Sequence, residues 1–342
     1  MVVAARPVPA VGRAVRSYTR RMPPVASVAW VLVAAILAIA AALLVRALLR
    51  HGPVKRLRRR LRTARAQALW ARPAAAVVRP VASRVIVTMT ASPDRLAGMD
   101  RTVRTLLNQT CPPDEVHLNI PHRFRRTGEE YAIPAWCGSL DPRVRVFRVE
   151  DIGPATKSVP TVERFRVDED VVIVIADDDV LYLQESLEVL LREVAVDRRA
   201  AYGFSGYDFG PRWASVLAHG RSEVQVIEGW ACVAAHRSCF GDGYAAHMAR
   251  ANESRACFCH DDVVMSNWFQ FHGVRRMQLH DASVNRRRMR KLGAQLDFGY
   301  LPGALHQESS GAGRARDAAR HLESLGCWRL RSPSTAVEPM GA

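Results

Sequence analysis

Three consecutive carboxylates follow a strongly apolar run in this chain. The run Val171-Val-Ile-Val-Ile175 consists only of β-branched residues, which predicts a strand buried on both faces, and Asp177, Asp178 and Asp179 follow it directly after Ala176. Adjacent acids repel one another, and a divalent cation with oxygen ligands removes that repulsion. Because α/β sheets bind ligands at the carboxyl ends of their strands, this pattern predicts a metal-bound phosphate site. The alternative is a solvated acidic turn.

Two other segments could complete such a site. Gly153-Pro-Ala-Thr-Lys157 follows an expected strand and lacks the spacing of a P-loop, but its lysine could neutralise a diphosphate. The alternative is an ordinary turn with an exposed lysine. The pair Asp261-Asp262 begins an expected helix. Carboxylates suit a helix start as a cap or as partners of the helix dipole, and one of them could instead be a general base.

Weaker signals come from Glu228-Gly-Trp230 and from His306. A carboxylate beside an indole is typical of a sugar site, although a core tryptophan next to a bulge glycine has the same sequence. His306 could be a further metal ligand or a structural histidine. The seven cysteines do not have zinc-site spacing; they could form disulfides in an oxidising compartment or stay free and buried.

Alternating strands and helices are expected to position these residues. The patterns predict strands at 83–90, 115–121, 143–149, 171–175, 201–205 and 224–233, and helices at 96–109, 183–194 and 262–271. Such alternation is typical of an α/β protein with a mainly parallel sheet and flanking helices. Residues 85–310 are long enough for one such domain with a full core.

The positive charge of the chain is confined to its first part. Residues 1–84 contain 17 Lys or Arg and no Asp or Glu, whereas the other 258 residues contain 32 basic and 33 acidic residues. A nucleic-acid-binding domain is basic over its own surface, so the neutral remainder argues against nucleic acid as a partner. Residues 25–45 carry no charge and would extend roughly 30 Å as a helix. They predict one transmembrane helix.

The chain is therefore expected to have five parts. These are a basic N-terminal segment (1–24), the transmembrane helix (25–45), a basic stalk (46–84), the α/β domain (85–310) and a loosely held C-terminal tail (311–342). This organisation predicts a single-pass membrane protein of the Golgi type or of the cell membrane. Flanking positive charges favour a cytosolic domain, whereas the cysteines and two glycosylation sequons favour a lumenal one.

In this order the segments resemble a GT-A glycosyltransferase. The likeness rests on the strand ending in Asp-Asp-Asp, the Gly-Pro-x-x-Lys turn before it, and the Gly-Trp segment and Asp-Asp helix start after it. The segment Thr88-Met-Thr-Ala-Ser-Pro-Asp-Arg95 is also similar to the nucleotide-facing first loop of that family. The likeness covers about residues 84–306 and is closest to family 2-like and membrane-anchored members. There is no Gln-x-x-Arg-Trp motif, which argues against a processive synthase.

The resemblance implies an enzyme with a GT-A type, Rossmann-like domain. The enzyme would use Mn²⁺ or Mg²⁺ and move a sugar from a nucleotide-diphosphate sugar to a hydroxyl of a glycan, lipid or protein. Asp179 and Asp177 would bind the metal, and His306 is a further candidate ligand. Asp262 would deprotonate the acceptor, which implies inversion at the anomeric carbon. Because family members often have Glu-Asp at this pair, Asp261 remains an alternative base. The donor would be bound by Thr88, Ser92, Arg95, Lys157, Asp177, Asp178, Glu228 and Trp230.

Two other functions remain open from the sequence. A metal-dependent phosphohydrolase or nucleotidyltransferase could use the same acids, usually with more than one acid cluster. A non-catalytic, membrane-tethered binding protein would have the acid run as a surface turn and an exposed Lys157.

Overall fold

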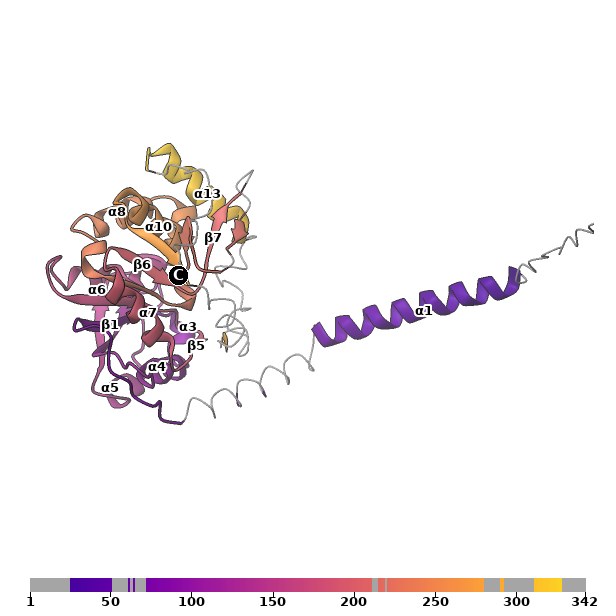
Figure 1. Cartoon of the computed structure of the whole chain (residues 1–342), viewed down its shortest axis with the longest axis horizontal. Helices are drawn as coiled ribbons and strands as arrows, with labels where there is room; N and C mark the ends of the chain where they lie inside the picture. Colours follow the sequence, from indigo (N-terminus) through magenta and orange to yellow (C-terminus); the bar gives the residue numbers. More distant parts are fainter. Residues whose placement is uncertain are drawn as a thin grey trace, which may run out of the picture. The chain divides into compact units, whose positions relative to one another are not determined.

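The computed structural model of this chain describes residues 25–50, 61, 64, 72–210, 215–218, 220–279, 290–291 and 311–327. The chain divides into two units, residues 1–58 and 59–342 (Figure 1).

The first unit contains helix α1 (Val25–Arg50). Among the described residues, none of the helices combines the length and the apolar content that crossing a membrane requires. The prediction of a transmembrane helix over 25–45 is therefore wrong, and so is the single-pass membrane location inferred from it.

An eight-stranded sheet forms the centre of the second unit, in the order β3-β2-β1-β4-β11-β6-β12-β9. The first four strands are parallel, and β11 is antiparallel to both of its neighbours, β4 and β6. The prediction of an α/β protein with a largely parallel sheet is confirmed. The strands are β1 (Arg84–Met89), β2 (Glu115–Pro121), β3 (Val144–Val149), β4 (Val171–Ile175), β6 (Ala200–Gly203), β9 (Ser222–Glu223), β11 (Val233–His236) and β12 (Arg275–Gln278).

Two smaller sheets flank the central one. The three-stranded sheet has the order β10 (Val226–Ile227), β7 (Gly206–Phe209) and β8 (Ser215–Leu217). The two-stranded sheet pairs β13 (Arg290–Lys291) with β5 (Val180–Leu181).

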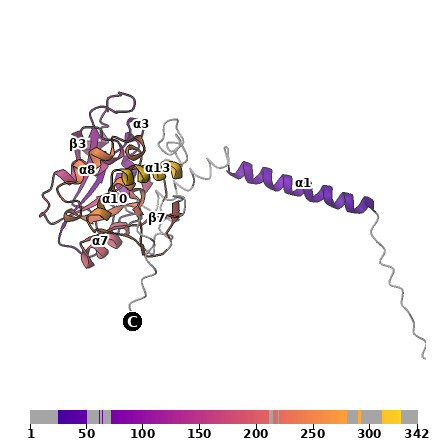
Figure 2. The same cartoon turned by 90° about the horizontal axis from the view of Figure 1, so that it is seen from above.

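Helices cover both faces of the central sheet. All five residues of β4 are buried, as its β-branched sequence predicts. Val172 and Val174 pack into one core with α4 (Asp100–Leu107) and α7 (Ser186–Val196). The alternate residues face a second core with α6 (Val159–Glu163), α8 (Tyr244–Ala251), α10 (Asp261–Phe271) and α13 (Gly311–Ser324). Figures 1 and 2 show α8, α10 and α13 grouped together.

Two predicted elements are each divided in the structure. The helix expected at 96–109 is replaced by α3 (Pro93–Leu96) and α4, because Gly98 lies between them and glycine is a poor helix former. The strand expected at 224–233 divides into β10 and β11 around the 3-10 turn η3 (Gly229–Ala231). The segment Glu228-Gly-Trp230 therefore lies in a turn between strands. Short elements elsewhere are α5 (Trp136–Ser139), η1 (Gly153–Lys157), η4 (Arg237–Cys239) and α9 (Arg255–Phe258).

Both expected boundaries of the α/β domain differ from the structure. The end of the expected stalk packs on the domain, because Val77 N–H donates to Thr110 O at 3.1 Å and Arg79 forms a 2.6 Å ion pair with Asp114. Part of the expected loose tail is helix α13, whose Ala318, Ala319 and Leu322 are fully buried. All seven cysteines are free thiols, so no disulfide forms among them.

Candidate active site

Lys157 lies at the centre of a cluster of carboxylates. Its Nζ donates to Asp177 Oδ1 at 2.9 Å, and it lies 3.1 Å from Asp261 Oδ2 and 4.0 Å from Asp262 Oδ1. Only 8% of the Lys157 side chain is exposed. Burial lowers the pKa of Lys157, but attraction by the three carboxylates outweighs burial, and the pKa lies well above its ordinary value. Lys157 is thus a charged, buried cation rather than an exposed turn residue.

A buried polar network fixes the backbone of Lys157. The Thr88 hydroxyl donates to Lys157 O, and Asn119 Nδ2 donates to Thr88 Oγ1 and to Thr161 Oγ1 at 3.0 Å each. Arg164 Nη1 donates to Asn119 Oδ1 at 2.9 Å. Thr88 is fully buried and positions Lys157, and its predicted contact with a nucleotide stays a prediction. Sequence reasoning missed Asn119, which alternates with apolar residues in the 115–121 strand together with Glu115 and His117.

The three acids after β4 point to different partners. Asp177 accepts from Lys157, and its own N–H donates to Tyr182 Oη at 2.9 Å. Arg95 Nη2 forms an ion pair with Asp178 and lies 3.5 Å from Asp179 Oδ2. The mutual repulsion of these acids is therefore relieved by two protein cations. A metal is not required for that purpose, which corrects one step of the sequence argument.

The donor atoms at the end of β4 still fit a hard cation. Among the residues that the structure describes, no group of three or more His, Cys, Asp or Glu could hold a metal ion. Mg²⁺, however, is usually bound through one or two carboxylates, with substrate phosphates and water completing its shell. Asp177 and Asp179 supply such oxygens, and the buried Asp178 Oδ2 has no hydrogen-bond partner. His306 lies outside the described residues, so its predicted ligation stays a prediction.

Asp261 and Asp262 are the first two residues of α10. The N-cap residue is His260, so neither carboxylate is the cap. Asp261 pairs with Lys157, whereas Asp262 Oδ1 accepts the Gly229 N–H at 3.0 Å. Burial raises the pKa of Asp262 well above its ordinary value, the nearby acids raise it further, and Lys157 lowers it only in part. A carboxyl with a raised pKa can accept a proton near neutral pH, as a general base must.

The close approach of Asp262 and Lys157 depends on Gly229. A Cβ at this position would lie 3.1 Å from Asp262 Oδ1 and 3.3 Å from Lys157 Nζ, so a side chain would crowd both. The turn then continues to Cys232, which is buried and has a left-handed φ of 71°. Non-glycine residues rarely adopt this conformation, and it often marks a functional turn.

Glu228 and Trp230 lie next to each other in this turn. Trp230 Nε1 donates to Glu228 Oε2 at 3.3 Å, and the Ser205 hydroxyl donates to the same oxygen. Trp230 is half-buried against the core, and its carbonyl accepts from Tyr182 Oη at 3.0 Å. Tyr182 thus links Trp230 to Asp177, a connection that sequence reasoning missed. Ser92 donates to its neighbour Asp94 at 2.6 Å, so its predicted contact with the donor remains a prediction.

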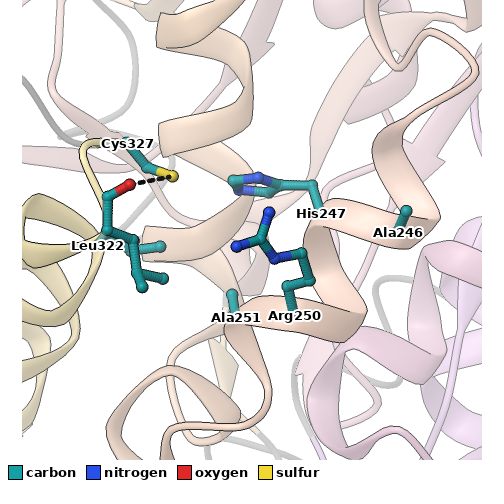
Figure 3. Close-up of a pocket in the computed structure, with 7 residues that line it drawn as sticks. Ala246, His247, Arg250, Ala251, Leu322 and Cys327 are labelled. Carbon is teal, nitrogen blue, oxygen red and sulfur yellow. Dashed lines mark hydrogen bonds between the residues drawn. The ribbon is translucent and has the colours of Figure 1, made fainter.

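Two hollows lie outside this cluster. A basic pocket of about 520 Å³ is lined by residues of the loop after β2 and of α9. A smaller cavity of about 220 Å³ lies between α8 and α13, where His247 and Arg250 face Leu322 and Cys327 (Figure 3). Burial lowers the pKa of His247. This cavity contains none of the residues predicted for the site.

No protein-family model and no curated protein sequence matches this chain. Among solved structures it is similar to GalNAc-T7 with UDP, GalNAc and Mn²⁺, at 11% identity and a TM-score of 0.44, over 72% of this chain and 49% of that one. It thus spans about half of that chain. It is also similar to the mannosyltransferase PcManGT from Pyrobaculum calidifontis in complex with GDP-Man and Mn²⁺, at 12% identity and a TM-score of 0.37, over 79% and 84% of the two chains.

Proposed function

We propose that this chain is a glycosyltransferase that uses a divalent cation and a nucleoside-diphosphate sugar. The observation that carries the proposal is the Lys157 cluster. It places a buried cation within 4.0 Å of carboxylates from two elements, the end of β4 and the start of α10. Glycosyl transfer needs positive charge where the diphosphate departs and a base where the hydroxyl attacks, and this cluster holds both.

Each residue of the cluster has one part in the reaction. Asp177 and Asp179 would hold Mn²⁺ or Mg²⁺, which as a Lewis acid stabilises charge on the leaving diphosphate. Lys157 is directed at the same charge, and Arg95 can turn from Asp178 to a phosphate oxygen. Asp262 accepts the proton of the acceptor hydroxyl. If Asp262 is the base, attack is in line with the departing diphosphate and the anomeric configuration inverts.

The two alternative functions have less support. A non-catalytic binding protein would have an exposed Lys157 and a surface acid run, but Lys157 and Asp178 are both buried. A two-metal phosphohydrolase needs two groups of metal ligands, and the described part of the chain contains no three-ligand group.

Thermal unfolding with UDP or GDP, with and without Mn²⁺, tests the proposal. We expect one nucleotide to raise the Tm only when the metal is present, because a ligand at 100 times its Kd stabilises a protein by about 2.7 kcal/mol. Asp179→Ala should remove this shift. Asp168→Ala is the matched control, because Asp168 pairs with Arg166 on the surface. A full shift in Asp179→Ala, or no shift with either nucleotide in the unmodified chain, would contradict the proposal.

A further inference from the structure

The basic pocket of about 520 Å³ has a composition suited to an anion. Arg125 and Arg126 come from the loop after β2, and Arg255 begins α9. The lining contains a single acidic residue, Glu253. Phe258 adds an aromatic surface to the same pocket. Guanidinium groups bind carboxylate, sulfate and phosphate through paired hydrogen bonds, and an aromatic ring packs against the face of a sugar.

Several contacts hold this pocket in place. Arg125 N–H donates to Asp151 Oδ2 at 2.7 Å, and the Arg125 guanidinium carbon lies 5.3 Å from the centre of the Phe258 ring. Asn252 Nδ2 donates to Ile152 O at 2.9 Å, while Asn252 Oδ1 is buried without a hydrogen-bond partner. The loop after β2 and the α8–α9 segment are thus both tied to residues just before η1.

The pocket is connected to the Lys157 cluster through η1. The Phe258 ring packs so closely on Gly153 that a Cβ there would lie 2.7 Å from it, and Gly153 has a left-handed φ of 72°. Gly153 begins η1 and Lys157 ends it, a distance of about 8 Å at the 3-10 rise of ~2.0 Å per residue. On the other side, Asp262 follows Phe258 by only four residues. The base of the proposed reaction therefore lies in the segment that follows Phe258 and Cys259, two residues of the pocket lining.

From this placement we infer that the pocket binds the acceptor, and that the acceptor carries an oxyanion, such as a uronate carboxylate or a sugar sulfate. The arginines bind the anionic group, Phe258 packs on a neighbouring ring, and the hydroxyl to be glycosylated lies toward Asp262. This inference rests on the proposed glycosyl transfer, and it names a class of acceptor for it.

Calorimetric titration of the full chain with three related saccharides tests the inference. The probes are a disaccharide ending in glucuronate, the same disaccharide bearing a sulfate instead, and the neutral disaccharide ending in glucose. We expect at least one anionic probe to bind about tenfold or more tightly than the neutral one, since hydrogen bonds to charged groups are the strong ones. The two anionic probes separate carboxylate from sulfate recognition.

The double variant Arg125→Gln/Arg255→Gln should lose this preference while its UDP or GDP binding with Mn²⁺ is kept. Both side chains are exposed, so the fold should be unaffected. Arg166→Gln removes one equally exposed charge elsewhere and should keep the preference. Equal binding of all three probes, with nucleotide binding intact, would overturn the inference and leave the proposed function standing. Binding of an anionic probe without any metal-dependent nucleotide binding would overturn the acceptor assignment together with the proposed function.

Discussion

Lys157 and Arg95 neutralise the same run of acids from two different kinds of position. Lys157 is the last residue of η1, its backbone is fixed by the Thr88–Asn119–Thr161 network, and 8% of its side chain is exposed. Arg95 belongs to the short helix α3 in the first loop, and 26% of its side chain is exposed. Its Nε is buried without a hydrogen-bond partner.

The difference indicates which cation can move during a reaction. Moving Lys157 would leave Asp177, Asp261 and Asp262 without their shared partner, which is costly for buried charges. Moving Arg95 frees Asp178 and Asp179, and a bound metal could neutralise these acids in its place. The site therefore combines one permanent cation with one that can be exchanged.

The largest effect is expected for Lys157→Met. This change keeps most of the volume but leaves three carboxylates without their cation. Breaking a buried ion pair in this way costs about 3–5 kcal/mol, which urea unfolding would measure as a lower midpoint. Arg166→Met is the control; it removes an exposed pair and should change the free energy of unfolding by about 0.5 kcal/mol or less. If the Lys157→Met protein were as stable as the unmodified chain, the contrast between a permanent Lys157 and an exchangeable Arg95 would not hold.

For Asp262→Asn we expect turnover to fall by about 10² or more, because a general base is lost, while nucleotide affinity by calorimetry stays unchanged. Asparagine keeps the oxygen that accepts the Gly229 N–H. If Asp262→Asn turns over normally and Asp261→Asn does not, the base is Asp261.

The difference in stability between the unmodified chain and Asp262→Asn should depend on pH, and the raised pKa of Asp262 gives the sign of that dependence. The pKa of Asp262 is raised in the folded chain. The contribution of this group to the free energy of unfolding is therefore full below the unfolded carboxyl pKa of about 3.9, and it is lost as the pH rises through the folded pKa. Above that value the asparagine variant, which does not ionise, should be the more stable of the two. Thermal unfolding of both proteins, measured from below the unfolded pKa to above the folded pKa, would show this difference. A lower Tm for the variant at high pH would contradict the raised pKa of Asp262.

Arg95→Gln should have a smaller effect, about 1–2 kcal/mol, because its side chain is partly exposed and its pairing with Asp179 is long. The comparison gives this variant a specific signature: excess Mn²⁺ should restore most of the lost Tm. Mn²⁺ should not restore Lys157→Met. If Mn²⁺ restored the Tm of both variants equally, the roles of Lys157 and Arg95 would not differ.

Gly229→Ala should have the smallest effect on stability, about 1 kcal/mol, since the new Cβ only crowds Asp262 and Lys157 by a few tenths of an ångström. Gly138→Ala is its control, because a Cβ at Gly138 meets nothing within 4 Å. The control should be neutral or slightly stabilising. Turnover should fall only in Gly229→Ala.

The sequence predicted the layered architecture because that depends on local patterns. The β-branched run of β4 and the alternation of β3 specify strands whatever lies around them. The short strands β7, β8 and β9 and the helix α13 were not predicted, because they are specified by contacts with distant residues. Ala315, Ala318 and Leu322 form an apolar stripe only when α9 and α10 are present to cover it.

Part of the site was also predicted from local features of the sequence. The acid run, Lys157 and the Asp261-Asp262 pair stand out by charge, and the structure brings Lys157 together with Asp177, Asp261 and Asp262. What the sequence could not show is which cation faces which acid. It also could not show that Thr88 is buried, because a threonine in a strand can lie on a buried face or on an exposed one.

The position of α13 has a consequence for how the protein is made. This helix packs on α9 and α10, yet it follows the end of α10 by some 40 to 50 residues. At about 5–20 residues per second, a ribosome needs roughly 2–10 s to add that length. Domains of this kind can form structure within milliseconds to seconds. The nascent chain therefore presents the bare apolar side of α9 and α10 to the cell until α13 is synthesised, and during that interval it is a substrate for chaperones.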